Sequence, residues 1–197
     1  ISNNWLSSQV LLMSILYLRG DYLGLAGMTE AVQPMLASIG TAAHRIDYLS
    51  SLAELAVRRE HFTLSDATVA LCEALLAAAQ EVEDPARMAS ARVGVGFGLL
   101  WADRTAQAAA SLLAGLELAE ACGLAYTEVL CLTYLACMHR FLGDAVEARR
   151  YAERSLVASQ QVDAPVYRAA AHANLAALHW RNGLVEVAQA EAERALT

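Results

Sequence analysis

Small and apolar residues recur with helical spacing along the chain, and short turns interrupt them at regular intervals. Segments 141–148 and 181–188 each have the pattern of a helix end, a turn and a new helix, with Gly143 and Gly183 in equivalent places. A further step of the same length towards the N-terminus reaches Asp103, again between two helical patterns. Turns near Gly20 and His61 keep a similar spacing. The resulting period of about 40 residues predicts a helical repeat array.

Equivalent positions around these turns hold small residues, which allow two antiparallel helices to cross closely. They are Gly96, Ala136 and Ala176 before the turn and Ala108, Ala148 and Ala188 after it. Each period therefore predicts one helix pair, in units of about 1–40, 41–83, 84–123, 124–163 and 164–197. The predicted helices are about 3–19, 22–38, 42–60, 64–82, 85–102, 104–121, 125–142, 144–161, 165–181 and 184–196.

Proline and glycine residues sharpen this helix map. Pro34 falls inside a predicted helix and is expected to kink it or end it early. Gly40 and Gly123 stand where a helix end favours a left-handed residue. Glycines of the segment 93–98 fall within a predicted helix, where each costs about 1 kcal/mol relative to alanine. Close helix packing would offset this cost, and a flexible or widened turn is the alternative.

The turn glycine with aspartate, followed five positions later by alanine, resembles the tetratricopeptide repeat. The resemblance is clear in the last three units and blurred in the first two, and the period is longer than the one usual in that family. It implies an all-α, right-handed superhelical array of about five helix pairs that binds partners without catalysis. Long helices of this kind resemble the sensor or scaffold arrays of bacterial signalling ATPases and maltose-regulator-type transcription activators. HEAT repeats share the longer period and rank second.

Composition excludes several other classes of protein. Apolar residues make up 57% of the 197 residues and charged residues 18%, which is too apolar for a disordered chain. A net charge of −7 without a basic stripe disfavours direct nucleic-acid binding. The apolar run 10–18 lacks the flanks of a signal peptide, and a membrane role is not expected. Four cysteines without disulfide spacing suit the cytoplasm, and the start at Ile1 suggests a piece of a larger protein.

No catalytic or cofactor motif is found, so we expect neither an enzyme nor a cofactor. The glycines of 93–98 do not follow a strand, which argues against a dinucleotide site. His139 and His179 occupy equivalent repeat positions and are interpreted as packing residues. Cys131, Cys137 and nearby histidines lack zinc-site spacing, so no metal is expected.

The tetratricopeptide resemblance places the first helix of each unit on a concave, partner-binding face. Carried over position by position, it gives the candidates Phe97, Trp101, Tyr134, Arg140, Phe141, Asn174, Trp180 and Arg181. Aromatic and arginine residues are common binding anchors, although the large aromatic side chains equally suit the core between units. The expected partner is a protein or peptide segment, or another domain of the same chain. The alternative is a sensor domain for a small-ligand or peptide effector.

Overall fold

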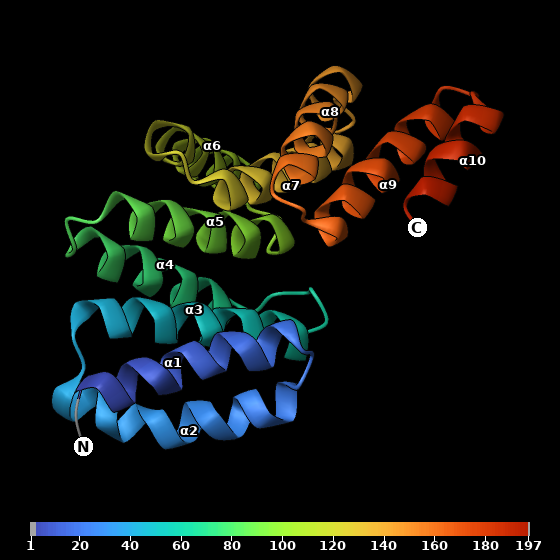
Figure 1. The fold of residues 1–197 in the computed structure, drawn as a ribbon. Coiled ribbons are helices and arrows are strands. Elements are labelled where there is room, and N and C mark those ends of the chain that lie inside the picture. Colours follow the sequence, from blue (N-terminus) through green and yellow to red (C-terminus); the bar gives the residue numbers. More distant parts are fainter. Residues whose placement is uncertain (1–2, 197) are drawn as a thin grey trace. The chain divides into compact units, whose positions relative to one another are not determined.

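A computed structural model describes residues 3–196, and every regular element in this range is an α-helix (Figure 1). The helices are α1 (Asn3–Leu18), α2 (Tyr22–Ile39), α3 (Ala42–Arg59), α4 (Asp66–Gln80), α5 (Pro85–Trp101), α6 (Thr105–Cys122), α7 (Ala125–Leu142), α8 (Ala145–Gln161), α9 (Pro165–Arg181) and α10 (Val185–Arg194). The all-α prediction is confirmed, and each predicted helix has an observed counterpart with similar bounds.

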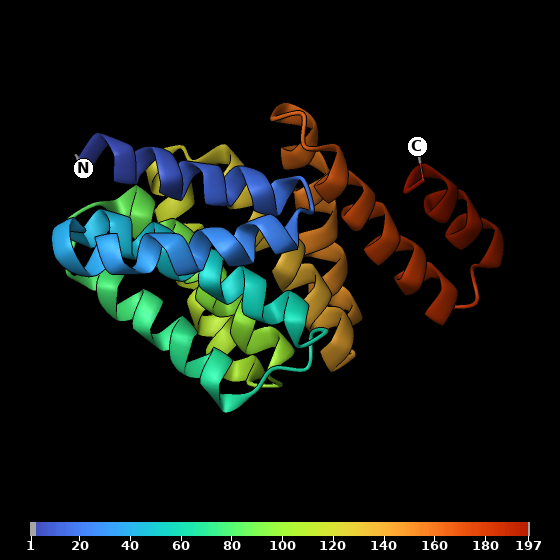
Figure 2. The same cartoon turned by 90° about the horizontal axis from the view of Figure 1, so that it is seen from below.

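The chain divides into two compact units, residues 1–108 and 109–197, with the division inside α6. In the first unit, α3 packs against α1, α2, α4 and α5. In the second unit, α9 packs against α7, α8 and α10, and Figure 2 shows α9 and α10 as an antiparallel pair. Four of the predicted helix pairs, α1–α2, α3–α4, α7–α8 and α9–α10, therefore pack together within these two units.

Local sequence signals begin and end the helices largely as expected. Pro85 and Pro165 occupy the first turns of α5 and α9, where a missing N–H is tolerated. The carboxylate of Asp144 accepts a hydrogen bond from the Glu147 backbone at the start of α8. Gly123 and Gly143 have φ of 65° and 80°, the left-handed conformation that suits a helix end.

The expectation at Gly40 is wrong, and of the two alternatives at Pro34 the early helix end does not occur. Helix α2 continues through Pro34 to Ile39, so the proline does not end it early. Tertiary packing of Leu25 and Val32, both fully buried, holds this helix despite the lost N–H. Gly40 has φ −67° and ψ 135°, so the chain leaves α2 in an extended conformation that needs no left-handed residue.

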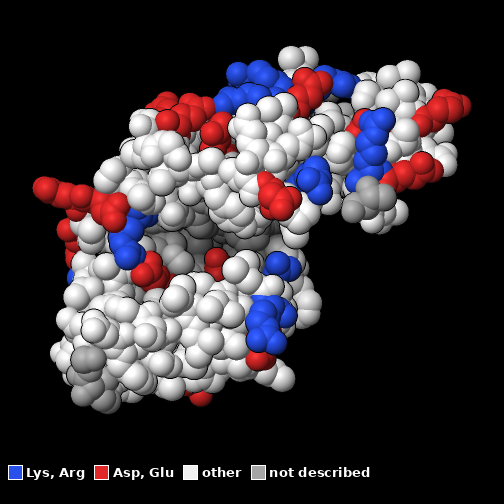
Figure 3. Space-filling view, viewed as in Figure 1, with Lys and Arg blue, Asp and Glu red and all other residues white. Residues whose placement is uncertain are grey.

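Each unit has its own apolar core. The core of the first unit includes the fully buried Leu6, Met13 and Leu25. Leu132 and Leu135 of α7 are fully buried in the second unit. Figure 3 shows few charged side chains on the visible surface over α1 and α2, consistent with α1 containing none.

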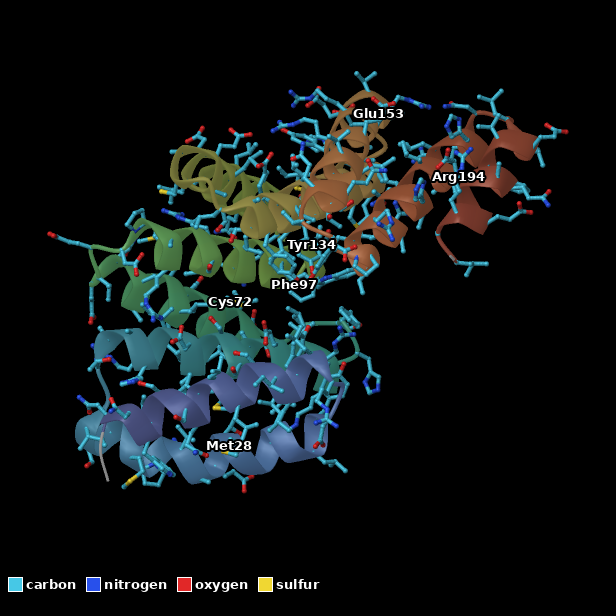
Figure 4. All side chains as sticks on the ribbon, in the orientation of Figure 1. Met28, Cys72, Phe97, Tyr134, Glu153 and Arg194 are labelled. Carbon is cyan, nitrogen blue, oxygen red and sulfur yellow. The ribbon has the colours of Figure 1, made fainter. Side chains whose placement is uncertain are left out.

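Within the first unit, α4 and α5 approach closely at two glycines. A Cβ placed on Gly94 would lie 3.2 Å from Leu75 Cδ2. A Cβ placed on Gly98 would overlap the sulfur of Cys72, which is fully buried on α4 (Figure 4). The expectation that these glycines lie within a helix is confirmed, and at Gly98 the close approach leaves no room for a larger residue.

Candidate partner-binding site

A cavity of about 580 Å³ opens in the second unit on α7, α9 and α10. Its lining residues are Arg140, Ala176, Ala177, Trp180, Arg181, Val185, Ala188, Gln189 and Ala192. We call this cavity the C-terminal groove. Most of its lining is small and apolar, and the large side chain of Trp180 is 64% exposed beside it. An exposed tryptophan beside an apolar groove is typical of a binding surface.

The guanidinium of Arg140 is held in place at this groove. Its Nε donates to Asn174 Oδ1 at 2.9 Å, and its charged carbon lies 4.7 Å from the centre of the Phe141 ring. Its Nη2 lies 3.8 Å from the Cys137 sulfur, and burial raises the pKa of that thiol despite the nearby positive charge. Because Asn174 and Phe141 fix the side chain, less conformational entropy remains to be lost when Arg140 binds a partner.

A second arginine approaches the same groove from the end of α9. The Nη1 of Arg181 donates to the backbone oxygen of Arg140 at 3.2 Å, which brings the two arginines to one end of the groove. Within residues 3–196, no carboxylate lies within ion-pair distance of either group. In contrast, Arg150 and Arg154 of α8 pair with glutamates. The groove thus offers two positive charges that the described part of the chain does not neutralise.

A largely buried hydrogen bond joins α9 and α10, two of the helices that line the groove. His172 Nδ1 on α9 lies 2.7 Å from Glu191 Oε2 on α10, and both side chains are only 12% exposed. Glu191 also accepts a hydrogen bond from Arg194 Nη1 at 2.5 Å. The contact between His172 and Glu191 helps fix the spacing of α9 and α10, because its loss would leave a buried polar group without this hydrogen bond.

The structure brings together some of the predicted site residues. Arg140, Trp180 and Arg181 line the C-terminal groove, and Phe141 supports Arg140 from one side. Asn174 is 6% exposed and bonded to Arg140, so it positions the arginine instead of facing the groove. Tyr134 is half-buried on α7 and is not part of the groove lining (Figure 4).

Phe97 and Trp101 belong to the first unit, where they pack in an aromatic cluster. The Phe62 ring lies 5.1 Å from Trp101 and 6.3 Å from Phe97 between ring centres. Arg58 lies over Phe62 at 5.0 Å and over Tyr17 and Tyr22 at 5.7 Å. The contact of Trp101 with Phe62 agrees with the alternative interpretation of Trp101, that it fills the core between successive repeats.

Sequence reasoning missed the role of Phe62 in this cluster. His61 and Phe62 have φ of 50° and 62°, a strained conformation for a bulky side chain. The sequence indicates a turn near His61, but no signal in it shows that two successive left-handed residues direct the Phe62 ring onto α5. The ring contacts help stabilise this backbone.

Glu54 on α3 is a half-buried acid near the same cluster. Burial raises its pKa to about 7, and Arg58 one turn later lowers it by a smaller amount. Its charge also contributes to a raised pKa of Tyr17, whose main cause is burial. Glu54 therefore changes its charge close to neutral pH.

The first unit has a polar cavity of about 480 Å³. Its lining residues are Ser7, Val10, Leu11, Ser14, Ala43, His44, Asp47 and Arg87. We call it the N-terminal cavity. Arg87 and Asp47 form an ion pair of 2.6 Å there, and this hydrogen bond is the main reason that the pKa of Arg87 is raised.

The contact of Ser7 with His44 in this cavity does not form a nucleophile and its base. The Thr41 backbone N–H donates to His44 Nδ1 at 3.2 Å. The neutral ring therefore carries its proton on Nε2, which donates to Ser7 Oγ at 2.8 Å. A general base must instead accept the serine proton, so His44 serves here as part of the helix cap.

The contacts of His139 agree with its interpretation from the sequence as a packing residue. His139 stacks on Tyr151 with 5.4 Å between ring centres, and its Nδ1 lies 3.3 Å from Asp144. His179 is half-buried at the equivalent position of α9. Within residues 3–196, no group of three or more His, Cys, Asp or Glu side chains is placed to hold a metal ion.

Comparison with known proteins adds evidence about the fold. The chain matches no protein-family model and no curated protein. A similar solved structure is BtubC (BKLC) from P. vanneervenii, with a TM-score of 0.64 and 21% identity over 97% of this chain and 72% of that one. This likeness supports the helical fold alone. In the described part of the chain, no helix is long and apolar enough to cross a membrane.

Proposed function

We propose that this chain is a non-catalytic interaction module whose C-terminal groove binds a segment of a protein partner. The observation that carries the proposal is the convergence of Arg140, Trp180 and Arg181 on one cavity. A large exposed aromatic side chain supplies apolar contact area, and two arginines without carboxylate partners among residues 3–196 supply charge recognition.

The wider architecture proposed for the module is a right-handed, tetratricopeptide-like array. Support comes from the repeated turns at Asp103, Gly143 and Gly183 and from the helix pairs within each unit. Such arrays serve as scaffolds because stacked units present an extended surface. A role in a bacterial signalling or transcription-regulatory protein is part of the same proposal and rests on the resemblance of the long helices.

Site-specific photo-crosslinking tests the proposed function. A photoreactive amino acid in place of Trp180 should capture a partner from the native cell, whereas the same group at the exposed Val157 of α8 should not. The captured partner, once purified, should bind the double variant Arg140→Ala, Arg181→Ala at least about tenfold more weakly than the unmodified chain.

The matched control for this pair is the double variant Arg149→Ala, Arg150→Ala on α8. Both residues form ion pairs with glutamates on their own helix, so their loss should leave partner binding unchanged. Equal melting temperatures for both double variants would show that folding is intact. If the α8 pair abolishes binding and the groove pair does not, the proposed face is wrong.

A second candidate function is the sensing of a small polar effector in the N-terminal cavity. Its hydroxyl groups and the Asp47–Arg87 pair offer donors and acceptors to such a ligand. A small molecule that raises the melting temperature of the chain, but not that of an Arg87→Ala variant, would favour this function. The double variant Arg140→Ala, Arg181→Ala should show the same rise in melting temperature with this molecule as the unmodified chain.

A further inference from the structure

The two helix pairs of the second unit can be compared position by position, because Gly143 and Gly183 mark the same turn in successive repeats. The C-terminal groove on α9 and α10 is then equivalent to the face of α7 and α8. On that earlier face a helix is already seated, since α9 packs against both α7 and α8. The protein thus shows what kind of element this type of face receives.

Burial of the equivalent alanines supports the comparison. Ala148 and Ala152 of α8 are completely buried. Their counterparts on α10 are Ala188, which is 5% exposed, and Ala192, which is exposed at the groove. Alanine at such positions lets the axis of a packed helix approach to about 8–10 Å, so the exposed alanine marks an unfilled helix-packing position.

The chemistry of the groove also favours a helical occupant over an extended one. From Val185 to Ala192 the groove follows about 10 Å of α10, or two helical turns. Along this length Gln189 is the one polar side chain of α10 in the lining. An extended peptide would leave backbone N–H and C=O groups without partners there, whereas a helix bonds its own backbone groups.

The two arginines determine the charge of the occupant. The helix seated on the earlier face, α9, contains no acidic residue, and it meets Arg140 through the neutral Asn174. At the C-terminal groove, Arg140 and Arg181 have no carboxylate partner among residues 3–196 and form one positive end. A carboxylate placed there gains charge-assisted hydrogen bonds from both guanidinium groups.

We propose that the C-terminal groove binds an acidic amphipathic α-helix supplied by a partner protein, an inference that rests on the proposed function. The helix places apolar side chains over Ala177, Ala188 and Ala192 at positions i, i+3 or i+4 and i+7. It places a glutamate or aspartate, or the negative end of its dipole, at Arg140 and Arg181.

A second copy of the chain is a poor source for this helix. Among residues 3–196, α1 exposes an apolar stripe over successive turns, at Leu11, Ile15 and Leu18. Helix α1 contains no charged residue, so it cannot supply the required carboxylate. An acidic helix from a partner of different sequence therefore fits the groove better than α1 of a second copy does.

Designed peptides test the inference by fluorescence anisotropy. The main probe is a labelled, alanine-based peptide of about 16 residues, long enough to form a helix, with leucines at i, i+3, i+4 and i+7 and two glutamates in the last turn. One control replaces two central alanines with proline, and another replaces the glutamates with glutamine. We expect each control to bind at least about tenfold more weakly than the main probe.

Variants of the chain assign the binding to the groove. Ala192→Trp should fill the groove and abolish binding of the probe, whereas Ala145→Trp, at an exposed position of α8, should not. In Arg140→Gln, Arg181→Gln the glutamate and glutamine peptides should bind equally, because the charge that distinguishes them is gone. Unchanged melting temperatures should accompany all of these results.

The outcomes separate this inference from the proposed function. If the proline peptide binds as tightly as the main probe, or no peptide binds while the crosslinked partner still requires both arginines, the helical inference fails and the function stands. If neither binding of the peptides nor binding of the crosslinked partner is weakened by the loss of Arg140 and Arg181, the helical inference and the proposed function both fail. If crosslinking from position 180 joins two copies of the chain, the partner-protein source is wrong.

Discussion

The contact of Gly98 with Cys72 gives the sharpest test of packing in the first unit. In Gly98→Ala, the new methyl group overlaps the Cys72 sulfur, which is fully buried. Overpacking of a core costs about 1–3 kcal/mol. The better helix propensity of alanine returns about 1 kcal/mol. The net expectation is a loss of roughly 0–2 kcal/mol in the free energy of unfolding.

A double-mutant cycle separates the cost of steric overlap with Cys72 from the gain in helix propensity at position 98. Cys72→Ala alone should destabilise the unit because it leaves a small cavity. In Gly98→Ala, Cys72→Ala, the new methyl group occupies space that the sulfur has vacated. The double variant should therefore be more stable than the sum of the single changes predicts, by about 1–3 kcal/mol.

The assay is urea unfolding followed by tryptophan fluorescence. The chain has three tryptophans, and replacing Trp5 and Trp180 with phenylalanine leaves Trp101 on α5 to report on the first unit. A coupling energy below about 0.5 kcal/mol would mean that the two sites act independently. That result would refute the close approach of α4 and α5 at this point.

Three other predictions concern different physical effects. Ala148→Leu should cost about 1–3 kcal/mol, because Ala148 is completely buried, whereas Ala145→Leu at an exposed position should cost much less; equal urea midpoints would contradict the repeat register. The pKa of Glu54 is raised from 4.5 to about 7 in the folded chain. The contribution of this carboxyl group to the free energy of unfolding is therefore fully present below pH 4.5 and is lost as the pH rises through 7. At pH 8 the free energy of unfolding of Glu54→Gln should therefore exceed that of the unmodified chain by up to about 3 kcal/mol, and at pH 4 the two should be nearly equal. A difference between the two chains that does not vary with pH would contradict the burial of Glu54. At His61, which has φ of 50° and is exposed, glycine should give a protein about 1 kcal/mol more stable than alanine does, as judged by thermal unfolding.

The helix map could be read from the sequence because its signals are local. Turn residues, helix caps and the recurrence of small residues all lie close to the boundaries they mark. The error at Gly40 arises because the chain leaves α2 in an extended conformation, and α2 does not end early at Pro34 because packing outweighs the local preference. Backbone geometry such as that of Phe62 depends on its contact with Trp101 at the far end of α5, and a contact so distant along the chain leaves no local signal.

The candidate site was predictable in composition but not in geometry. The repeat register identified Arg140, Trp180 and Arg181 as candidates, and all three line one cavity. It could not show that Asn174 would be buried as a partner of Arg140, because that depends on how α9 rests on α7. One continuous groove through Phe97, Trp101 and Tyr134 remains a prediction.

The order of helix contacts has a consequence for how the chain folds during synthesis. Among residues 3–196, the contacts within each unit join a helix to the next helix or to the one after it. Contacts this local form quickly, because little chain must be closed into a loop before they are made. The contacts among α1–α5 need no residue that is made after α5, so they can form while the rest of the chain is still being synthesised.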